Sequence, residues 1–165
     1  MFADLTRGFG ETDGTCFYWA LAAQLALTKH GIRAEPRAGS ASWRRAADDV
    51  DDGMPPHLFY EWDDDATDDD IEEQLTAGCL PEIHIWTVVV DTDEIVDLST
   101  PFLPAVVAAV GGGAVWTMPT PGILWAVDPR EVLECGYTST QRATKLAARL
   151  MSEHLQAVAA MRSRR

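Results

Sequence analysis

An uncharged stretch near the start of the chain predicts a buried helix. Residues 16–28 (CFYWALAAQLALT) carry no charged side chain and consist largely of Ala and Leu. Thr15, with Asp13 as the alternative, precedes the stretch as a candidate N-cap, and Gly31 follows it as a candidate left-handed residue. A helix that is apolar on nearly every face must be buried on nearly every face, so we expect it at the centre of the fold.

A β-branched and aromatic pattern further along the chain predicts a hairpin. Residues 83–90 (IHIWTVVV) have the composition of a strand, residues 91–93 (DTD) that of a turn, and residues 94–98 (EIVDL) supply a return strand. Opposed residues of an antiparallel pair lie on the same face of the sheet. The face that each side chain occupies therefore depends on whether the loop holds an even or an odd number of residues.

The length of this loop decides whether His84 and Asp97 can meet. The two side chains share a face only if the loop is even, and the first alternative is a two-residue loop at Asp91 and Thr92. It places Asp97 opposite Trp86 and diagonal to His84, with Cα atoms about 7–8 Å apart, which is within reach of a carboxylate–imidazole hydrogen bond. A three-residue loop would instead place the two side chains on opposite faces.

A second apolar stretch, residues 102–127, carries no charge but is broken by several glycines and prolines. Such breaks argue against a membrane-spanning helix. We expect a short helix at residues 105–110, a glycine turn at residues 111–113 and a closing strand at residues 122–127.

Charge is distributed unevenly along what we expect to be one domain of 165 residues with a net charge of −13. Residues 46–75 hold 13 of the 26 acidic residues and no Lys or Arg. We interpret this acidic insertion as a strand at residues 57–62 and a solvated loop, with a helix beginning near Thr67, where acidic side chains suit the helix dipole. Calcium binding is the alternative, but the spacing and central glycine of an EF-hand loop are missing, so no metal site is predicted.

Residues 138–163 are predicted to form an amphipathic C-terminal helix. From residue 138 to the last residue of the sequence, six basic residues stand against one acidic residue, Glu153. The net negative charge of the chain argues against nucleic-acid binding. We expect this helix to pack on the domain. Contact with the acidic insertion, pairing in a homodimer and docking on a protein partner are the alternatives.

The cysteine pattern indicates a reducing compartment. The chain has three cysteines, an odd number, and their spacing fits neither a disulfide framework nor a zinc site. We therefore expect Cys79 and Cys135 to be reduced, and we predict no cofactor. The first residues lack the basic region and apolar run of a secretory signal, so we expect a cytoplasmic protein without a membrane segment.

The candidate chemistry is a thiol assisted by an imidazole and a carboxylate. A helix N-terminus and a neighbouring imidazole both favour the thiolate form of cysteine. Cys16 opens the predicted helix, and the hairpin supplies His84 and Asp97. His84 would take the thiol proton and Asp97 would fix the tautomer of His84. Taken singly, a buried thiol, a core histidine and an exposed aspartate are the ordinary interpretations, and His57 is the rival imidazole.

These residues resemble the transglutaminase-like branch of the papain-like cysteine enzymes. The matching segments are Gly14-Thr15-Cys16 at a helix start, His84-Ile85-Trp86 on a strand and residues 95–100 (IVDLST) on the next strand. The resemblance covers roughly residues 10–130 and implies an α+β fold, in which a central N-terminal helix packs on an antiparallel sheet. It also implies a Cys16–His84–Asp97 triad and acyl-thioester chemistry on a peptide, amide or thioester substrate.

Several points are left open by the sequence. The oxyanion would be held by the backbone N–H of Cys16 and a second donor that the sequence does not identify. Candidate pocket residues are Trp43, Trp62, Trp86 and Phe102, although tryptophans are more often core residues. There are three alternatives to a thiol hydrolase or acyltransferase. The first is a leader peptidase-like maturation protein of a modified-peptide pathway, such as the pathway of lasso peptides. The second is a catalytically inactive binding module on the same fold, and the third is an unrelated α+β fold with an inert Cys16.

Overall fold

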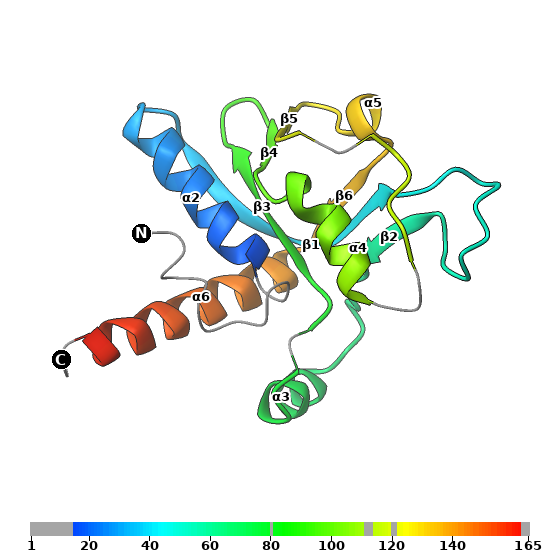
Figure 1. The fold of residues 1–165 in the computed structure, drawn as a ribbon. Coiled ribbons are helices and arrows are strands. Elements are labelled where there is room, and N and C mark those ends of the chain that lie inside the picture. The colour runs from blue at the N-terminus through cyan, green and yellow to red at the C-terminus, as the bar shows by residue number, and fades with distance from the viewer. Residues whose placement is uncertain (1–14, 80, 111–113, 120–121, 163–165) are drawn as a thin grey trace.

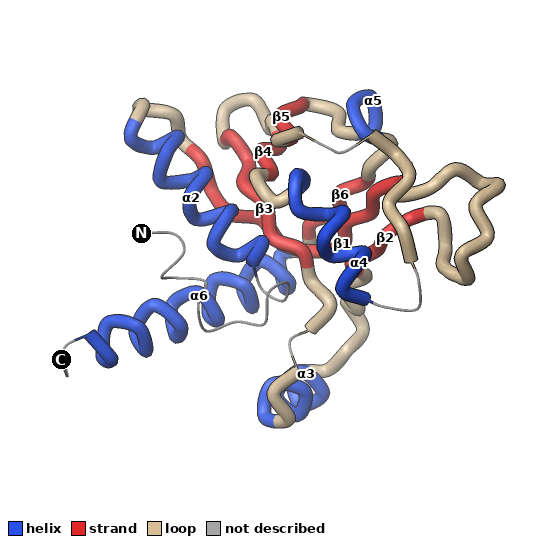
Figure 2. The backbone as a smooth tube through the Cα atoms, in the orientation of Figure 1, coloured by secondary structure: helices blue, strands red, loops and turns tan. Residues whose placement is uncertain are grey.

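The computed structural model describes residues 15–79, 81–110, 114–119 and 122–162 (Figure 1). In these residues the protein is α+β, with an open antiparallel sheet flanked by helices (Figure 2). The helices are α2 (Thr15–Lys29), α3 (Asp68–Thr76), α4 (Leu103–Val110), α5 (Arg130–Leu133), α6 (Gln141–Arg162) and the 3-10 helix η1 (Thr100–Phe102). The strands are β1 (Ala34–Arg44), β2 (His57–Tyr60), β3 (His84–Val89), β4 (Ile95–Asp97), β5 (Leu124–Ala126) and β6 (Gly136–Ser139).

Strand β1 organises the sheet, because it pairs antiparallel with β2, β3 and β6. At Gly39 it is paired with both β3 and β6, and at Ala41 with both β2 and β6. Strand β6 therefore occupies one edge of β1, and β3 and β2 follow one another along the other edge. His84, at the start of β3, consequently lies next to Tyr60, at the end of β2. Strands β4 and β5 continue the sheet beyond β3.

Helices cover both faces of this sheet. Side chains alternate between the two faces along each strand. Ile85 of β3 packs with Ala20 of α2 and Leu146 of α6 on one face. Trp43 of β1 packs with Leu103 of α4 on the other face. In Figure 1, α2 and α6 accordingly lie on one side of β3 and α4 lies on the other.

Helix α2 confirms the helix predicted at residues 16–28 and the glycine that ends it. Gly31 has a φ of 77°, and the N–H of Ile32 donates to the carbonyl oxygen of Leu27 at 3.0 Å, so the helix ends in a Schellman motif. The expectation that nearly every face is buried is wrong, since among residues 16–28 only Tyr18, Ala20, Ala23 and Leu27 are buried. Leu25 is 62% exposed, because the sheet covers only one side of the helix at this point.

The predicted hairpin register is confirmed, although the loop is longer than expected. Thr87 of β3 pairs with Val96 of β4, which sets Trp86 opposite Asp97. Residues 90–93 form the connection, rather than Asp91 and Thr92 alone, and the N–H of Val89 donates to the carbonyl oxygen of Glu94. The register is unchanged because the longer loop takes one additional residue from each strand.

The C-terminal helix begins at Gln141, later than the predicted start at residue 138. Residues 136–139 form β6 instead. The hydroxyl of Thr140 accepts a hydrogen bond from the N–H of Ala143 at 3.1 Å and so caps the helix. The β-branched Thr138 and its neighbours extend along β1, where their backbone groups find partners that a helix end would not provide.

The apolar stretch after Asp97 folds close to expectation. The predicted helix at residues 105–110 is confirmed and is longer, since η1 leads into α4 at Leu103. The closing strand is confirmed as β5, and the predicted glycine turn at residues 111–113 lies outside the described residues. None of the helices in the described ranges combines the length and the apolar character that a bilayer crossing requires.

The start of the acidic insertion is held by a buried arginine. Arg45 is 1% exposed and donates two hydrogen bonds of 2.7 Å to the carboxylate of Asp52. Its remaining N–H groups donate to the carbonyl oxygens of Met54, Pro55 and Val115. These bonds to Arg45 hold the pKa of Asp52 well below its usual value. The loop is therefore tied to the sheet through a fully bonded guanidinium group.

The end of the acidic insertion confirms the predicted helix start. Thr67 caps α3, since its side chain accepts a hydrogen bond from the N–H of Asp70 at 3.2 Å. The carboxylate of Asp70 in turn accepts from the N–H of Thr67 at 2.8 Å, which completes a capping box. Ile71 of α3 is buried in the same cluster as Ile85. The segment is thus an amphipathic helix with a defined N-terminus.

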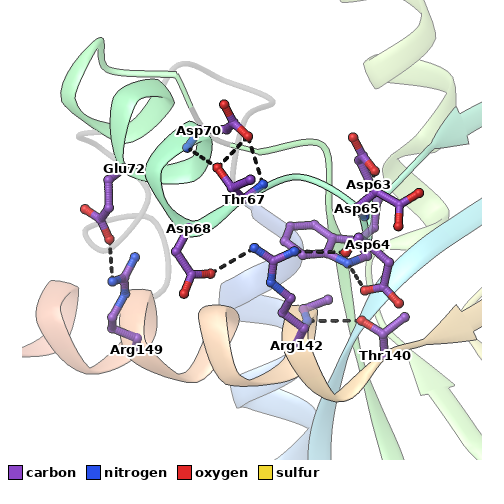
Figure 3. Close-up of polar contacts among 12 residues, drawn as sticks. Asp63, Asp64, Asp65, Thr67, Asp68, Asp70, Glu72, Thr140, Arg142 and Arg149 are labelled. Carbon is purple, nitrogen blue, oxygen red and sulfur yellow. Dashed lines mark hydrogen bonds and ion pairs between the residues drawn. The ribbon is translucent and has the colours of Figure 1, made fainter.

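Ion pairs fasten α3 to α6 (Figure 3). Arg142 of α6 donates to the carbonyl oxygen of Asp64 at 2.9 Å and to the carboxylate of Asp68 at 2.8 Å. About two turns further along α6, Arg149 pairs with Glu72 at 2.5 Å. The expected packing of the C-terminal helix on the domain is therefore confirmed, and the structure also shows the contact with the acidic insertion that was given as an alternative.

Candidate functional site

Cys16 lies in the first turn of α2 and is partly buried against the cluster around Ile85. The helix is fixed to the sheet by polar contacts as well as by packing. The hydroxyl of Thr87 donates to the carbonyl oxygen of Ala20 at 2.8 Å, and the amide of Gln24 donates to the carbonyl oxygen of Ala34 at 3.2 Å. The N–H groups of a first helical turn have no partner within the helix, so the surroundings of the Cys16 thiol are electropositive.

His84 and Asp97 form a buried pair at the point where the sequence places it. The Nε2 atom of His84 lies 2.7 Å from Oδ2 of Asp97, and each residue is 2% exposed. The other carboxylate oxygen, Oδ1, accepts hydrogen bonds from the N–H of Ser99 at 2.8 Å and from its hydroxyl at 2.6 Å. The predicted carboxylate–imidazole contact is confirmed, and the carboxylate is held from both ends.

The electrostatics of this pair favour its ionised form. Burial by itself would lower the pKa of His84, but Asp97 and then Cys16 act against it, and the pKa rises from 6.5 to about 10. Burial by itself would raise the pKa of Asp97, but His84 and Ser99 hold it below its usual value. At neutral pH the pair is therefore an imidazolium and a carboxylate.

The second ring nitrogen of His84, Nδ1, takes no part in the contact with Asp97. Nδ1 is buried and has no hydrogen-bond partner among the residues that the structure describes. Cys16 nevertheless raises the pKa of His84, so its thiol is near the ring. Because Nε2 is committed to Asp97, Nδ1 is the ring nitrogen that the His84–Asp97 pair does not use. The structure thus brings His84 and Asp97 into contact, and Cys16 acts on the pKa of His84 from the first turn of α2.

An aromatic wall surrounds the His84 ring. Trp43 presents its ring edge-on at 4.8 Å, and Trp86 lies nearly parallel at 6.1 Å between centroids. Tyr60 and Tyr137 complete the wall at 5.5 Å and 6.0 Å. These side chains keep water from the His84–Asp97 hydrogen bond, which strengthens the electrostatic contact between the two groups.

Two polar residues of the site were not predicted from the sequence. Ser99 follows Asp97 by two residues, a spacing at which a serine commonly bonds an aspartate, so this signal was available. Tyr137 donates to Oδ2 of Asp97 at 2.8 Å, but it comes from β6, a strand whose residues were expected to lie at or before the start of a helix. No local pattern links it to Asp97.

The predicted pocket residues divide into three core side chains and one exposed one. Trp43, Trp62 and Trp86 are all less than a tenth exposed, while Phe102 is 44% exposed. Phe102 stacks on Trp19, with 5.0 Å between the ring centroids. Trp19 lies in α2, one helical turn after Cys16. A substrate on the surface of the protein would therefore meet Phe102 rather than the three tryptophans.

The rival groups named from the sequence lie elsewhere or have structural roles. His57 in β2 lies against the ring of Phe59, and the imidazole that bonds Asp97 is that of His84. Cys135 is buried, donates to the carbonyl oxygen of Pro129 at 3.2 Å, and has its pKa raised to about 12 by burial. Cys79 is an exposed free thiol. Among the described residues there is no cluster of His, Cys, Asp and Glu that could hold a metal ion.

No known family model, no curated protein and no solved structure matches this chain. The site therefore has to be interpreted from its own geometry, as a half-buried thiol at a helix start beside a buried imidazolium–carboxylate pair.

Proposed function

We propose that the protein is a thiol-dependent enzyme that hydrolyses or transfers acyl groups, with Cys16 as its nucleophile. The observation that carries this proposal is the buried His84–Asp97 pair, whose remaining ring nitrogen, Nδ1, has no hydrogen-bond partner among the described residues, while Cys16 contributes to the raised pKa of the ring. An imidazole held by a carboxylate on one nitrogen and facing a thiol with the other is the arrangement that cysteine catalysis requires. His84 acts as general acid and base, and Asp97 orients it.

The reaction begins with the thiolate of Cys16 beside the imidazolium of His84. The sulfur attacks the carbonyl carbon of an amide or thioester, and a new C–S bond forms. The Nδ1 proton of His84 passes to the leaving amine or thiol as its bond to the carbonyl carbon breaks, which leaves an acyl-enzyme. Neutral His84 then takes a proton from a water or amine that attacks the acyl carbon, and the sulfur of Cys16 leaves as thiolate.

The oxyanion of each tetrahedral intermediate is placed near the start of α2. The backbone N–H of Cys16 belongs to the first helical turn and has no intrahelical partner, so it is free to donate to that oxygen. Asp97 stays ionised throughout, because four hydrogen bonds from His84, Ser99 and Tyr137 stabilise its charge.

A transglutaminase-like form of the papain-like fold is the finer part of the proposal. It is supported by α2, which carries Cys16 in its first turn, and by the antiparallel strands β3 and β4, which carry His84 and Asp97. The expected substrate is a peptide, another amide or a thioester, and the exposed Phe102 favours an apolar group next to the scissile carbonyl.

The test is to trap the acyl-enzyme with p-nitrophenyl acetate, an activated ester that reports a reactive thiolate whatever the natural substrate is. The Cys79→Ser variant serves as the reference protein, because it lacks the exposed thiol. We expect a burst of p-nitrophenolate and one acetyl group on the Cys16 peptide by mass spectrometry. Cys16→Ala should abolish both signals, and His84→Ala should slow acetylation by about 10²-fold or more.

Two results would count against the proposal. Acetylation that continues at the same rate in Cys16→Ala would place the reactive group elsewhere. A folded reference protein that forms no adduct at all would indicate a catalytically inactive binding module.

A further inference from the structure

Tyr137 is bonded in a way that packing alone does not require. Its hydroxyl lies 2.8 Å from Oδ2 of Asp97 and 3.0 Å from Nε1 of Trp43. The indole N–H can only donate a hydrogen bond, so the Tyr137 oxygen is the acceptor of that contact. The single proton of the Tyr137 hydroxyl must then point at Asp97. The direction of the whole chain of hydrogen bonds, from Trp43 through Tyr137 to Asp97, is therefore fixed by chemistry.

This hydroxyl shares its acceptor with the imidazole. Oδ2 of Asp97 accepts from Nε2 of His84 at 2.7 Å and from Tyr137 at 2.8 Å, while Oδ1 accepts both bonds from Ser99. Every donor to the carboxylate stabilises its negative charge and weakens the field that the charge exerts on its other partners. Tyr137 thus competes with His84 for the same oxygen.

We propose that Tyr137 is a positioning residue that limits how strongly Asp97 holds the proton of His84, which rests on the function proposed for Cys16, His84 and Asp97. Without the hydroxyl, the charge of Asp97 would act on His84 alone at Oδ2. The imidazolium would then keep its Nδ1 proton more firmly and would be a poorer acid toward the leaving group. The hydroxyl also fixes the position of Oδ2, because Trp43 anchors Tyr137 from behind.

Among the residues that the structure describes, few titratable groups lie around this network. Tyr60 and Tyr137 face the His84 ring, Cys16 contributes to the raised pKa of that ring, and the buried Cys135 is close enough to Asp97 for the carboxylate to raise its pKa. Tyr137 itself is kept neutral, because burial and the charge of Asp97 raise its pKa well above 10. Of these groups, only Tyr137 donates to Asp97, so its removal isolates the effect of one hydrogen bond.

The Tyr137→Phe variant tests this inference, because it deletes one oxygen atom and keeps the ring. The ring contacts of Tyr137 with Trp86, at 5.0 Å, and with His84 are retained. Tyr60→Phe is the matched control, since it removes a hydroxyl from another ring beside His84 without touching the donors of Asp97. The pKa of His84 is measured in both variants and in the original protein by NMR titration of its ring nitrogens.

We expect Tyr137→Phe to raise the pKa of His84 by on the order of half a unit to one unit, and Tyr60→Phe to leave it within about 0.2 units. Proton transfer from His84 to the leaving group should slow, so that kcat decreases about two- to tenfold for substrates with amine leaving groups while KM changes little. A His84 pKa that is the same in Tyr137→Phe as in the original protein would overturn the inference and leave Tyr137 with a packing role.

Failure of this inference can be told apart from failure of the proposed function. The NMR titration requires no turnover, so a shifted pKa in a protein that forms no acyl-enzyme would support the positioning role and refute the enzymatic one. An unshifted pKa in a protein that does form the acyl-enzyme would have the opposite meaning. Circular dichroism and thermal unfolding of Tyr137→Phe establish that the comparison is made between folded proteins.

Discussion

Replacing Asp97 by Asn should destabilise the protein in a manner that depends strongly on pH. The substitution keeps the shape of the side chain and removes its charge. Hydrogen-bond donors from His84, Tyr137 and Ser99 converge on this carboxylate, and the Asn side chain can accept at only one of its two positions. The amide group that replaces Oδ2 would donate to Nε2 of His84, so the imidazole would be neutral and would carry its proton on Nδ1.

The size of the effect follows from the pKa of His84. In the folded protein this pKa is about 10, and in the unfolded chain it is expected near 6.5. At pH 7 the proton on folded His84 therefore contributes about 4 kcal/mol of stability, at roughly 1.4 kcal/mol for each pH unit below the folded value. Because the folded pKa is the higher one, this contribution is complete below about pH 6.5 and is lost as the pH rises toward 10.

Urea unfolding followed by tryptophan fluorescence measures this difference. We expect Asp97→Asn to lower the free energy of unfolding by about 4 kcal/mol at pH 7, with a loss that shrinks steadily between pH 7 and pH 9. Asp128→Asn is the matched control, because Asp128 pairs with Arg130 at the surface and its effect should not vary over this range. A loss for Asp97→Asn that is constant from pH 6 to pH 9 would refute the argument that the pair is ionised.

Two further predictions concern the fold. Gly39→Ala should prevent β6 from pairing with β1 and lower the melting temperature by more than about 10 °C, since its Cβ would lie 2.1 Å from the backbone oxygen of Thr138. In Gly136→Ala the new Cβ meets only the rotatable hydroxyl of Ser42, at 3.2 Å, so the melting temperature should fall by less than about 4 °C. Thermal unfolding measures both variants, and equal losses of melting temperature would contradict this account. Thr67→Ala should cost about 1 kcal/mol of stability by removing the N-cap of α3, whereas Thr67→Ser should cost little, and urea unfolding of the two variants distinguishes capping from packing.

The parts of the fold that could be predicted from the sequence are those with a strong local pattern. The charge-free helix, the β-branched strand at residues 83–90 and the Thr-Asp helix start near residue 67 each carry their own periodicity or capping residues. Strand β1 was missed because AEPRAGSASWR contains no β-branched residue and includes a proline and a glycine. It forms a strand because neighbours on both edges satisfy its backbone groups.

In the candidate site, too, only the residues linked by a local pattern could be predicted from the sequence. His84 and Asp97 could be paired by hairpin register, because their separation is short and one loop sets it. Tyr137 and Trp43 reach the site from strands far from the hairpin in the sequence, and only the assembled sheet brings them together. Register arithmetic applies within one hairpin and does not extend to such distant partners.

The pairing of β6 with β1 also bears on the order in which the site is completed during synthesis of the chain. Ala41 of β1 pairs with Tyr137 of β6, although nearly a hundred residues separate the two strands in the sequence. Contacts of such long sequence separation form slowly and late. A chain emerging from the ribosome would carry Cys16, His84 and Asp97 before β6 exists, and the wall around His84 would still lack Tyr137. The reactive thiol would therefore gain its fully enclosed base only after β6 has been made and has docked on β1.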